Sequence, residues 1–406
     1  MLRIFLTTLV AFLVTTGVAP AQMKSVPVTT PTKTYTKFAP PDAHECERIG
    51  LVLEEAVRLS DIAGAEAVVD WQALYTRAMN GIPAPERTRT NFLETADANL
   101  KGATGIMANL VQTVASGGSF RLLRVVENGL DARVVFRLAH LHGGVPDYVT
   151  FVLETTADGG TFVTDIDRAS EGDVTSLRLR RYFLGLASGV TRNLDEKVRG
   201  NDRLRVQWQK QLEAADDAFL TGRNREVLEI LASLPDDLAR DRSVMLTRVN
   251  AARAISSKMF DAVLAFARAT LPADLAIERI ALDHFLETNA HDEARRTVST
   301  VNAAVGGDPY LDWIAATIED DSGDLAAARA ACARAILGDE RLAEPYWTLL
   351  SINVRERRFS DALRILESLN ARFDIDWSGI ESAGAYQAFF ESEYGKAWKT
   401  RIASRR

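Results

Sequence analysis

Cysteine and histidine are scarce in this chain, with two and five copies among 406 residues. The sequence has no C-x-x-C pair, no zinc helix with paired histidines and no calcium-binding loop. It also lacks a G-x-S-x-G nucleophile elbow and a phosphate loop ending in Gly-Lys-Ser/Thr. These absences argue against the enzyme and zinc-protein classes that such motifs define. We therefore expect a non-enzymatic protein with no metal and no cofactor.

The two cysteines are expected to be free thiols. Cys46 and Cys332 fall in different predicted domains, and a single possible pair is a poor basis for a disulfide framework. Cys332 lies in an alanine-rich helix, where a sulfhydryl packs like a small apolar group. The run His44-Glu45-Cys46-Glu47 resembles a metal cluster, but adjacent residues of a helix point in different directions, so a helix start is favoured.

The first residues have the pattern of a secretory signal peptide spanning 1–21. Arg3 supplies a positive charge, Ile4–Val14 is almost uninterruptedly apolar, and Ala19-Pro20-Ala21 is a small-residue exit. The apolar run is shorter than the roughly 20 residues of a transmembrane helix, and no basic stop-transfer cluster follows it. We expect cleavage near Ala21, a periplasmic or secreted protein and no stable membrane insertion; retention as an uncleaved anchor is the alternative.

Composition predicts a folded chain of two domains. The sequence is 47% hydrophobic and 25% charged, as in ordinary globular proteins, and its length suits two domains. Residues 22–44 hold four prolines and little apolar material, which predicts a flexible leader. The net charge of −7 makes nucleic acid an unfavourable partner. A short basic tail, interpreted as a solvated helix face, contains Lys396, Lys399, Arg401, Arg405 and Arg406.

Residues 45–185 are predicted to form an α+β domain. Helical periodicity over 45–59, 67–79 and 88–114 precedes four β-rich runs over 120–126, 132–138, 148–154 and 162–167. Asn-Gly and Gly-Gly turns between these runs predict hairpins. Helices packed on a four-stranded antiparallel curved sheet follow, although 68–74 also suits a short strand.

This order of helices and strands resembles nuclear-transport-factor-2-like folds. In that family the cone between sheet and helices holds a small ligand or is filled with side chains, and filling is the favoured interpretation here. A ligand-binding protein is the alternative, and its cavity would be lined by Trp71, Phe136, Tyr148 and Phe151.

An enzyme built on this cone, or a metal site, requires particular residues of the sheet. Asp165 and Asp167 share one face of a strand and are the candidate general bases, provided that one is buried with a raised pKa. His140 and His142 also share a strand face, but two histidines without a third ligand favour surface positions.

After a connecting helix over 186–206, residues 207–370 contain a repeated pattern. Five segments align on small or apolar anchors, namely Val227, Ala262, Ala294, Ala328 and Ala362, although the interval from Ala262 to Ala294 is slightly short. A period of about 34 residues and an alanine where two helices cross resemble tetratricopeptide repeats, which stack helix pairs into a superhelical solenoid. Apolar residues four and seven positions after each anchor are predicted to face the neighbouring helix. They are Leu231 and Leu234, Phe266 and Ala269, Val298 and Val301, Cys332 and Ala335, and Leu366 and Leu369.

The segment 371–406 is predicted to cap the solenoid with a helix over 385–402. Five aromatic residues recur in this helix at spacings of three and four, which suits coverage of the last open apolar edge. Binding of a partner by this helix is the alternative.

The resemblance also implies a binding groove. Positions two, five, nine and twelve of the first helix of each tetratricopeptide pair face the concave surface. Here they are Ala276, Arg279, Asp283 and Leu286; Tyr310, Trp313, Thr317 and Asp320; and Glu344, Trp347, Ser351 and Val354. Two equivalent tryptophans near an arginine suit a protein or extended peptide segment. A shift of one residue in register would instead bury both tryptophans. The favoured function is an exported scaffold or adaptor.

Overall fold

The structure is a computed structural model that describes residues 40–141, 143–373, 375, 377, 380 and 384–403. The expected signal peptide and most of the expected leader lie outside the described residues, as do His142, Arg405 and Arg406. Within the described part of the chain, no helix is long and apolar enough to cross a bilayer. The chain divides into two compact units between Ile277 and Glu278, and the domain boundaries drawn from the sequence stay predictions.

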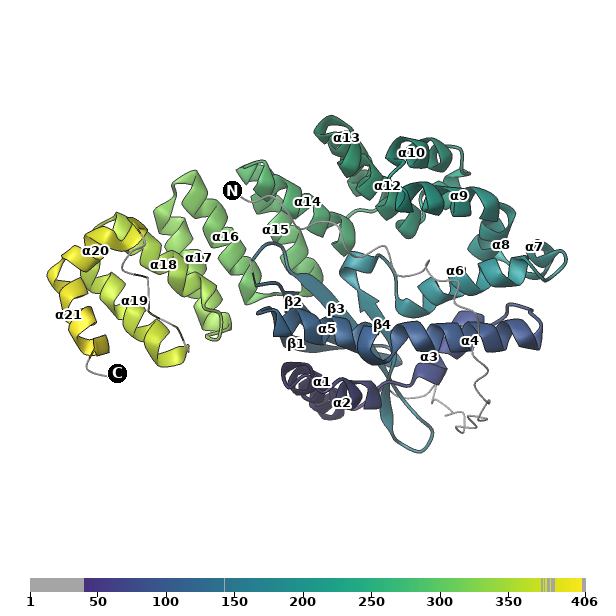
Figure 1. Cartoon of the computed structure of the whole chain (residues 1–406), viewed down its shortest axis with the longest axis horizontal. Coiled ribbons are helices and arrows are strands. Elements are labelled where there is room, and N and C mark those ends of the chain that lie inside the picture. The colour runs from purple at the N-terminus through teal and green to yellow at the C-terminus, as the bar shows by residue number, and fades with distance from the viewer. Residues whose placement is uncertain are drawn as a thin grey trace. The chain divides into compact units, whose positions relative to one another are not determined.

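The first unit begins with five helices followed by four strands (Figure 1). The helices are α1 (Ala43–Arg58), α2 (Ile62–Ala67), α3 (Trp71–Met79), α4 (Glu86–Leu100) and α5 (Ile106–Ala115). The strands are β1 (Ser119–Asn128), β2 (Asp131–Ala139), β3 (Asp147–Thr155) and β4 (Thr161–Arg168). They form one antiparallel sheet in the order β1-β2-β3-β4, which confirms the predicted sheet and its hairpins.

The helix predicted over 67–79 starts only at Trp71, because Val69 pairs with the sheet, and the separate helix α2 ends at Ala67. Val69 forms a parallel bridge to Val163 of β4, and the Asp70 N–H donates to the Val163 carbonyl over 2.8 Å. The Asp70 carboxylate then accepts the Ala73 N–H over 3.1 Å and starts α3. The strand alternative for 68–74 is thus limited to a single bridging residue.

Aromatic side chains fill the space between the helices and the sheet. The rings of Phe120 and Phe136 stack with centroids 4.3 Å apart, and Phe151 meets Phe136 edge-on at 5.4 Å. Helices α1 and α5 pack on β1 and β2. At Gly50 of α1, an added Cβ would lie 2.9 Å from a methyl carbon of Val134, so the close approach of helix and sheet requires glycine.

Helices alone form the remainder of the first unit. They are α6 (Thr175–Ser188), α7 (Leu194–Lys197), α8 (Gly200–Gln207), α9 (Gln209–Leu220), α10 (Asn224–Ala232), α11 (Asp236–Ala239), α12 (Arg242–Ile255) and α13 (Ser257–Thr270). The single connecting helix expected over 186–206 is interrupted. Asn193 and Gly200 have positive φ angles of 51° and 56°, which a continuous right-handed helix does not accommodate.

The second unit is also helical. Helix α14 (Leu275–Glu287) starts just before the division and is followed by α15 (His291–Val305), α16 (Pro309–Ser322), α17 (Leu325–Gly338), α18 (Glu344–Arg355), α19 (Phe359–Arg372), α20 (Gln387–Glu391) and α21 (Glu393–Ala403). A helix-rich C-terminal part therefore follows the α+β part, as predicted.

Helices of the C-terminal part pack in consecutive pairs. Helix α9 packs on α10, α12 on α13, α16 on α17 and α18 on α19. The second helices α10, α13, α15, α17 and α19 begin at Asn224, Ser257, His291, Leu325 and Phe359. Each start follows the previous one by about 34 residues. The backbone therefore repeats with a more even period than the sequence alignment indicated.

One of the five aligned segments has a different register from the predicted one. In α13 the expected anchor Ala262 and its partner Phe266 are exposed, whereas Phe260, Leu264 and Ala267 are buried. With Phe260 as the anchor, the intervals between successive anchors become nearly equal. The error arose because α13 carries apolar residues on two faces. In the other four segments the anchor and the residues four and seven positions later are all buried.

The last helices cover α18 and α19 with aromatic side chains. Phe389, Phe390 and Trp398 are buried in one cluster with Tyr346 and Leu366. The single helix expected over 385–402 is broken at Ser392, whose hydroxyl oxygen accepts the Gly395 N–H over 3.2 Å at the start of α21.

Candidate functional site

The predicted groove residues lie on α14, α16 and α18, but three of them are not accessible. Ala276, Tyr310 and Val354 are 2%, 1% and 4% exposed and belong to the interior. The others are partly buried: Arg279, Asp283, Leu286, Trp313, Thr317, Asp320, Glu344, Trp347 and Ser351. Both tryptophans therefore remain partly exposed. A shift of one residue in register would instead have buried both.

Both tryptophans also make contacts within the chain. The indole N–H of Trp313 donates to the Thr348 hydroxyl over 3.0 Å, which links α16 to α18. Trp347 lies 6.0 Å from Trp377 between ring centroids. Asp320 of α16 forms an ion pair with Arg355 of α18. The surface formed by the first helices is thus held in place by contacts among its own side chains.

The four residues proposed to line a cone in the N-terminal part do not share one cavity. Trp71, Phe136 and Phe151 belong to the hydrophobic core. Tyr148 pairs with Arg137 across the sheet and, three residues from Phe151 on β3, points to the opposite face. This packing agrees with the interpretation of a cone filled with side chains.

The first candidate base, Asp165, has a capping role. Its carboxylate accepts the Ser176 N–H over 3.1 Å and also the Ser176 hydroxyl, in the first turn of α6. It accepts the Ile166 N–H over 2.9 Å as well. These donors hold the carboxylate at the start of the helix, where the helix dipole favours negative charge.

Asp167, the second candidate base, has the raised pKa that an acid–base role on this strand would require. Burial raises the pKa of Asp167, while the charge of Arg242 opposes this effect. Its Oδ1 atom has no hydrogen-bond partner among the described residues. A carboxylate with a raised pKa is one part of an acid–base site. It does not define a reaction without a nucleophile or a second acid–base group in contact with it.

The metal hypothesis rests on residues that the structure describes only in part. His140 is exposed after β2, and its proposed companion His142 lies outside the described residues. No group of three His, Cys, Asp or Glu residues in the described part of the chain is placed to hold a metal ion.

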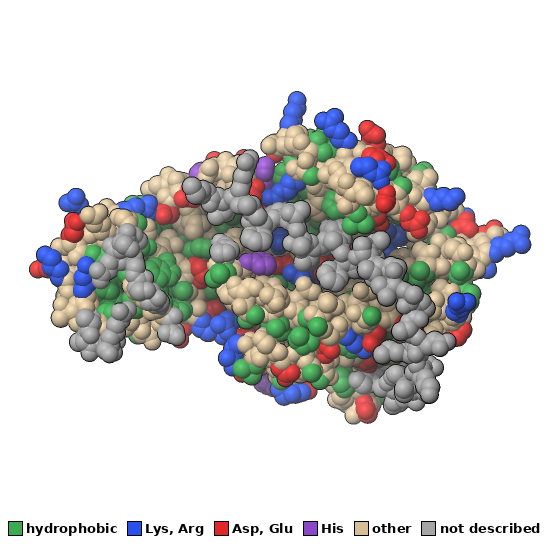
Figure 2. Space-filling model, in the orientation of Figure 1, with side chains coloured by type: hydrophobic (Ala, Val, Ile, Leu, Met, Phe, Trp, Pro, Cys, Tyr) green, Lys and Arg blue, Asp and Glu red, His purple; other side chains and the backbone are tan. Residues whose placement is uncertain are grey.

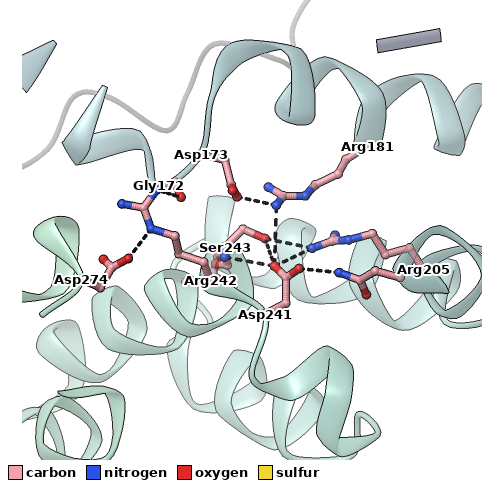
Figure 3. A network of polar contacts seen from close by, with 10 residues as sticks. Gly172, Asp173, Arg181, Arg205, Asp241, Arg242, Ser243 and Asp274 are labelled. Carbon is pink, nitrogen blue, oxygen red and sulfur yellow. Dashed lines mark hydrogen bonds and ion pairs between the residues drawn. The ribbon is translucent and has the colours of Figure 1, made fainter. Parts of the chain in front are cut away.

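A polar network that sequence reasoning missed joins α6, α8 and α12 within the first unit (Figure 3). At its centre is Asp241, the N-cap of α12. Its Oδ1 atom lies 2.6 Å from an Nη atom of Arg205 and 3.7 Å from one of Arg181. The Ser243 N–H and hydroxyl donate to the same oxygen over 3.1 Å and 2.7 Å, and Asn201 donates to Oδ2 over 2.7 Å.

Two further arginine–aspartate pairs extend this network. Arg181 pairs with Asp173, and Arg242 lies 2.5 Å from Asp274, which caps the start of α14 (Figure 3). Arg242 also donates to the Gly172 carbonyl. Gly172 has a φ angle of 80°, and an added Cβ would lie 2.1 Å from Leu246 of α12, so only glycine fits this contact.

The charges of the network compensate one another. Burial alone raises the pKa of Asp241, but the charges of Arg205 and Arg181 and hydrogen bonds from Ser243 and Arg205 outweigh it and lower the pKa to about 2. Burial lowers the pKa of Arg205, yet an arginine stays charged at neutral pH. Three arginines face three aspartates, so we assign the network a structural role, holding the start of α12 against α6 and α8.

Charged side chains are not gathered by sign on the face shown in Figure 2. Basic and acidic side chains are interspersed over the helices visible there. Charged side chains of the described residues often pair locally, as Arg295 does with Glu319 over 2.8 Å. Recognition by a large field of one sign is not supported on this face.

No protein-family model, no curated protein and no solved structure matches this chain. The case for its function therefore rests on the geometry of its own helices.

The two thiols are expected to be unreactive in the folded protein. Both are free and buried, and burial raises the pKa of Cys46 to about 11 and of Cys332 to about 12. Because the thiolate is the reactive form, a reagent such as DTNB at pH 8 should label neither thiol in the native protein and both in denaturant. Labelling of either thiol within minutes in the native protein would contradict this assignment, as would failure to label both after unfolding.

Proposed function

We propose that this chain is an exported, non-enzymatic scaffold that binds a protein or an extended peptide through a solenoid of tetratricopeptide-like helix pairs. The observation that carries the proposal is the even repeat of second helices, which start about every 34 residues, with buried side chains at the same three positions counted from each start. A single helix pair cannot bury its apolar face alone, so such repeats are stable when stacked.

The side chains at the repeated positions suit close helix crossings. Ala294, Ala328 and Ala362 are each at most 1% exposed, at the third residue after the helix start. An alanine lets two helix backbones approach closely, and the larger residues four and seven positions later fill the space beyond the crossing. This arrangement uses one face of each second helix for packing and supports a role for the first helices in recognition.

The proposed recognition surface lies on the first helices α16 and α18. Trp313 and Trp347 occupy equivalent positions, remain partly exposed and are flanked by Asp320 and Glu344. Aromatic residues dominate binding energy at protein interfaces, and polar residues around them orient the partner. An extended segment with apolar side chains fits this combination best.

The remaining parts of the proposal rest on sequence patterns. The signal-peptide pattern over 1–21 supports a periplasmic or secreted location, with a mature chain that is not inserted in a membrane. The likeness of the N-terminal part to nuclear-transport-factor-2-like folds is consistent with five helices followed by an antiparallel sheet. Because its core is packed with aromatic rings, we assign this part a docking or stabilising role rather than ligand binding.

The test is an affinity capture from the native cell envelope with the wild-type chain and a Trp313→Ala/Trp347→Ala variant. We expect a protein that the wild type retains to be lost with the variant, because two aromatic contacts are removed from one surface. Quantitative binding of the captured protein should weaken at least 100-fold, or about 2.7 kcal/mol.

Phe390→Ala is the matched control, since both tryptophans also pack inside the chain. This variant removes a buried aromatic ring from the hydrophobic cluster against which Trp347 packs, but it keeps both tryptophan side chains. Loss of capture by both variants would assign the effect to stability, and retention by both would rule out the proposed surface.

A further inference from the structure

A surface pocket of about 270 Å³ lies in the second unit, where α17, α18 and α19 meet. Its lining residues are Arg329, Leu349, Asn353, Arg358, Asp361, Arg364 and Ile365. None of them belongs to the predicted groove, and five come from α17, α19 or the residue that precedes α19. The pocket is therefore distinct from the recognition surface proposed above.

One donor in this pocket is buried without a hydrogen-bond partner among the described residues. It is the Nε atom of Arg329. Buried donors are nearly always hydrogen-bonded in folded proteins, so this group calls for an acceptor. Asn353, which is 5% exposed as a residue, lines the same pocket and supplies an amide as a second donor.

The arginines of the pocket are only partly neutralised. Arg358 and Arg364 share one carboxylate, that of Asp361, with an Arg358 Nη atom 2.6 Å from Asp361 Oδ2. Arg329 forms an ion pair with Glu356 outside the lining. Burial lowers the pKa of Arg329 and the charge of Arg358 lowers it further, while the charge of Asp361 opposes both effects; an added negative charge would relieve the repulsion between the arginines.

Leu349 and Ile365 supply partly buried apolar wall beside these donors. A carboxylate bearing a short aliphatic chain matches both parts of the lining. The guanidinium and amide N–H groups can donate to the carboxylate oxygens, and the methylene groups can contact the two aliphatic side chains. A volume of about 270 Å³ corresponds to about nine water molecules at about 30 Å³ each, which is enough for a small organic acid.

We propose that this pocket binds a small organic acid, with Arg329 and Asn353 donating hydrogen bonds to its carboxylate. The site does not depend on the peptide-binding role proposed for α16 and α18. It gives the solenoid a second ligand class and a second surface, formed where two consecutive helix pairs meet.

The experiment is a calorimetric titration of the full chain with glutarate at constant ionic strength, beside inorganic phosphate and a glutamate-rich peptide. We expect saturable one-to-one binding of glutarate, with weaker binding of the other two probes. Arg329→Gln and Asn353→Leu should each weaken glutarate binding at least tenfold, which corresponds to about 1.4 kcal/mol. Arg296→Gln, which neutralises an exposed arginine of α15 paired with Glu293, should bind like the wild type.

Asn353→Asp keeps the test decisive if the other variants are poorly folded. It preserves the size of the side chain and places a carboxylate where the anion should bind, so a folded Asn353→Asp protein should not bind glutarate. The proposal is overturned if the wild type shows no saturable binding, if phosphate or the peptide binds as tightly as glutarate, or if Asn353→Asp binds normally.

Discussion

Asp241→Ala is expected to lower the free energy of unfolding of the first unit by about 3–5 kcal/mol, because it leaves Arg205 buried without its counter-charge. The variant also removes the acceptor of Ser243 and Asn201 and the N-cap of α12. Denaturant unfolding followed by circular dichroism measures the change. Asp217→Ala is the matched control. Its partner Arg223 is exposed, so the loss should be below about 1 kcal/mol.

The pH dependence of stability separates the charge of Asp241 from its packing. The pKa of Asp241 is about 2 in the folded protein, below its ordinary value, so ionisation stabilises the fold above about pH 4. This contribution, on the order of 2 kcal/mol, is lost as pH falls from about 4 to about 2. In Asp241→Asn this part of the acid-induced loss should be absent. Equal pH profiles for the wild type and this variant would contradict the structural role of the network.

Sequence periodicity predicted the sheet because its signals are local. Strands β1 and β2 are joined by a tight turn at Gly129, and apolar residues alternate along each strand, as at Val134, Phe136 and Leu138. The network around Asp241 has no such signal. Its members come from segments far apart in the sequence, as Asp173 and Asp241 are, and arginine–aspartate spacings of this kind occur in any charged chain. Only the packing of α6, α8 and α12 brings them together.

The groove stays a prediction. The repeat period puts Trp313 and Trp347 34 residues apart, on α16 and α18, because these helices follow one another at nearly constant length. The period does not report how deeply each position is buried. Tyr310 occupies a groove position by counting but packs edge-on against Trp313 at 4.9 Å and is inaccessible. Asn353 was not singled out, since only the packing of α17, α18 and α19 places it in a pocket beside Arg329.

Sequence periodicity was ambiguous in α13, because this helix carries apolar residues on two faces. Phe260→Ala is expected to lower the free energy of unfolding by about 3–5 kcal/mol, because Phe260 is 2% exposed at the crossing of α12 and α13. Phe266→Ala makes the same chemical change further along the same helix. Phe266 is 48% exposed and contacts the Arg248 guanidinium at 5.9 Å, so its loss should be below about 1 kcal/mol.

Comparing these two variants by denaturant unfolding tests the repeat itself. If Phe260→Ala is the more damaging change, the packing face of α13 coincides with those of α10, α15, α17 and α19, and the anchors follow one another at nearly equal intervals. If Phe266→Ala is the more damaging change, Ala262 is the true anchor, and the intervals to Val227 and Ala294 on either side of it are unequal. A continuous stack of similar helix pairs requires similar crossings, so the second result would remove the main support for a regular solenoid and for the groove built on it.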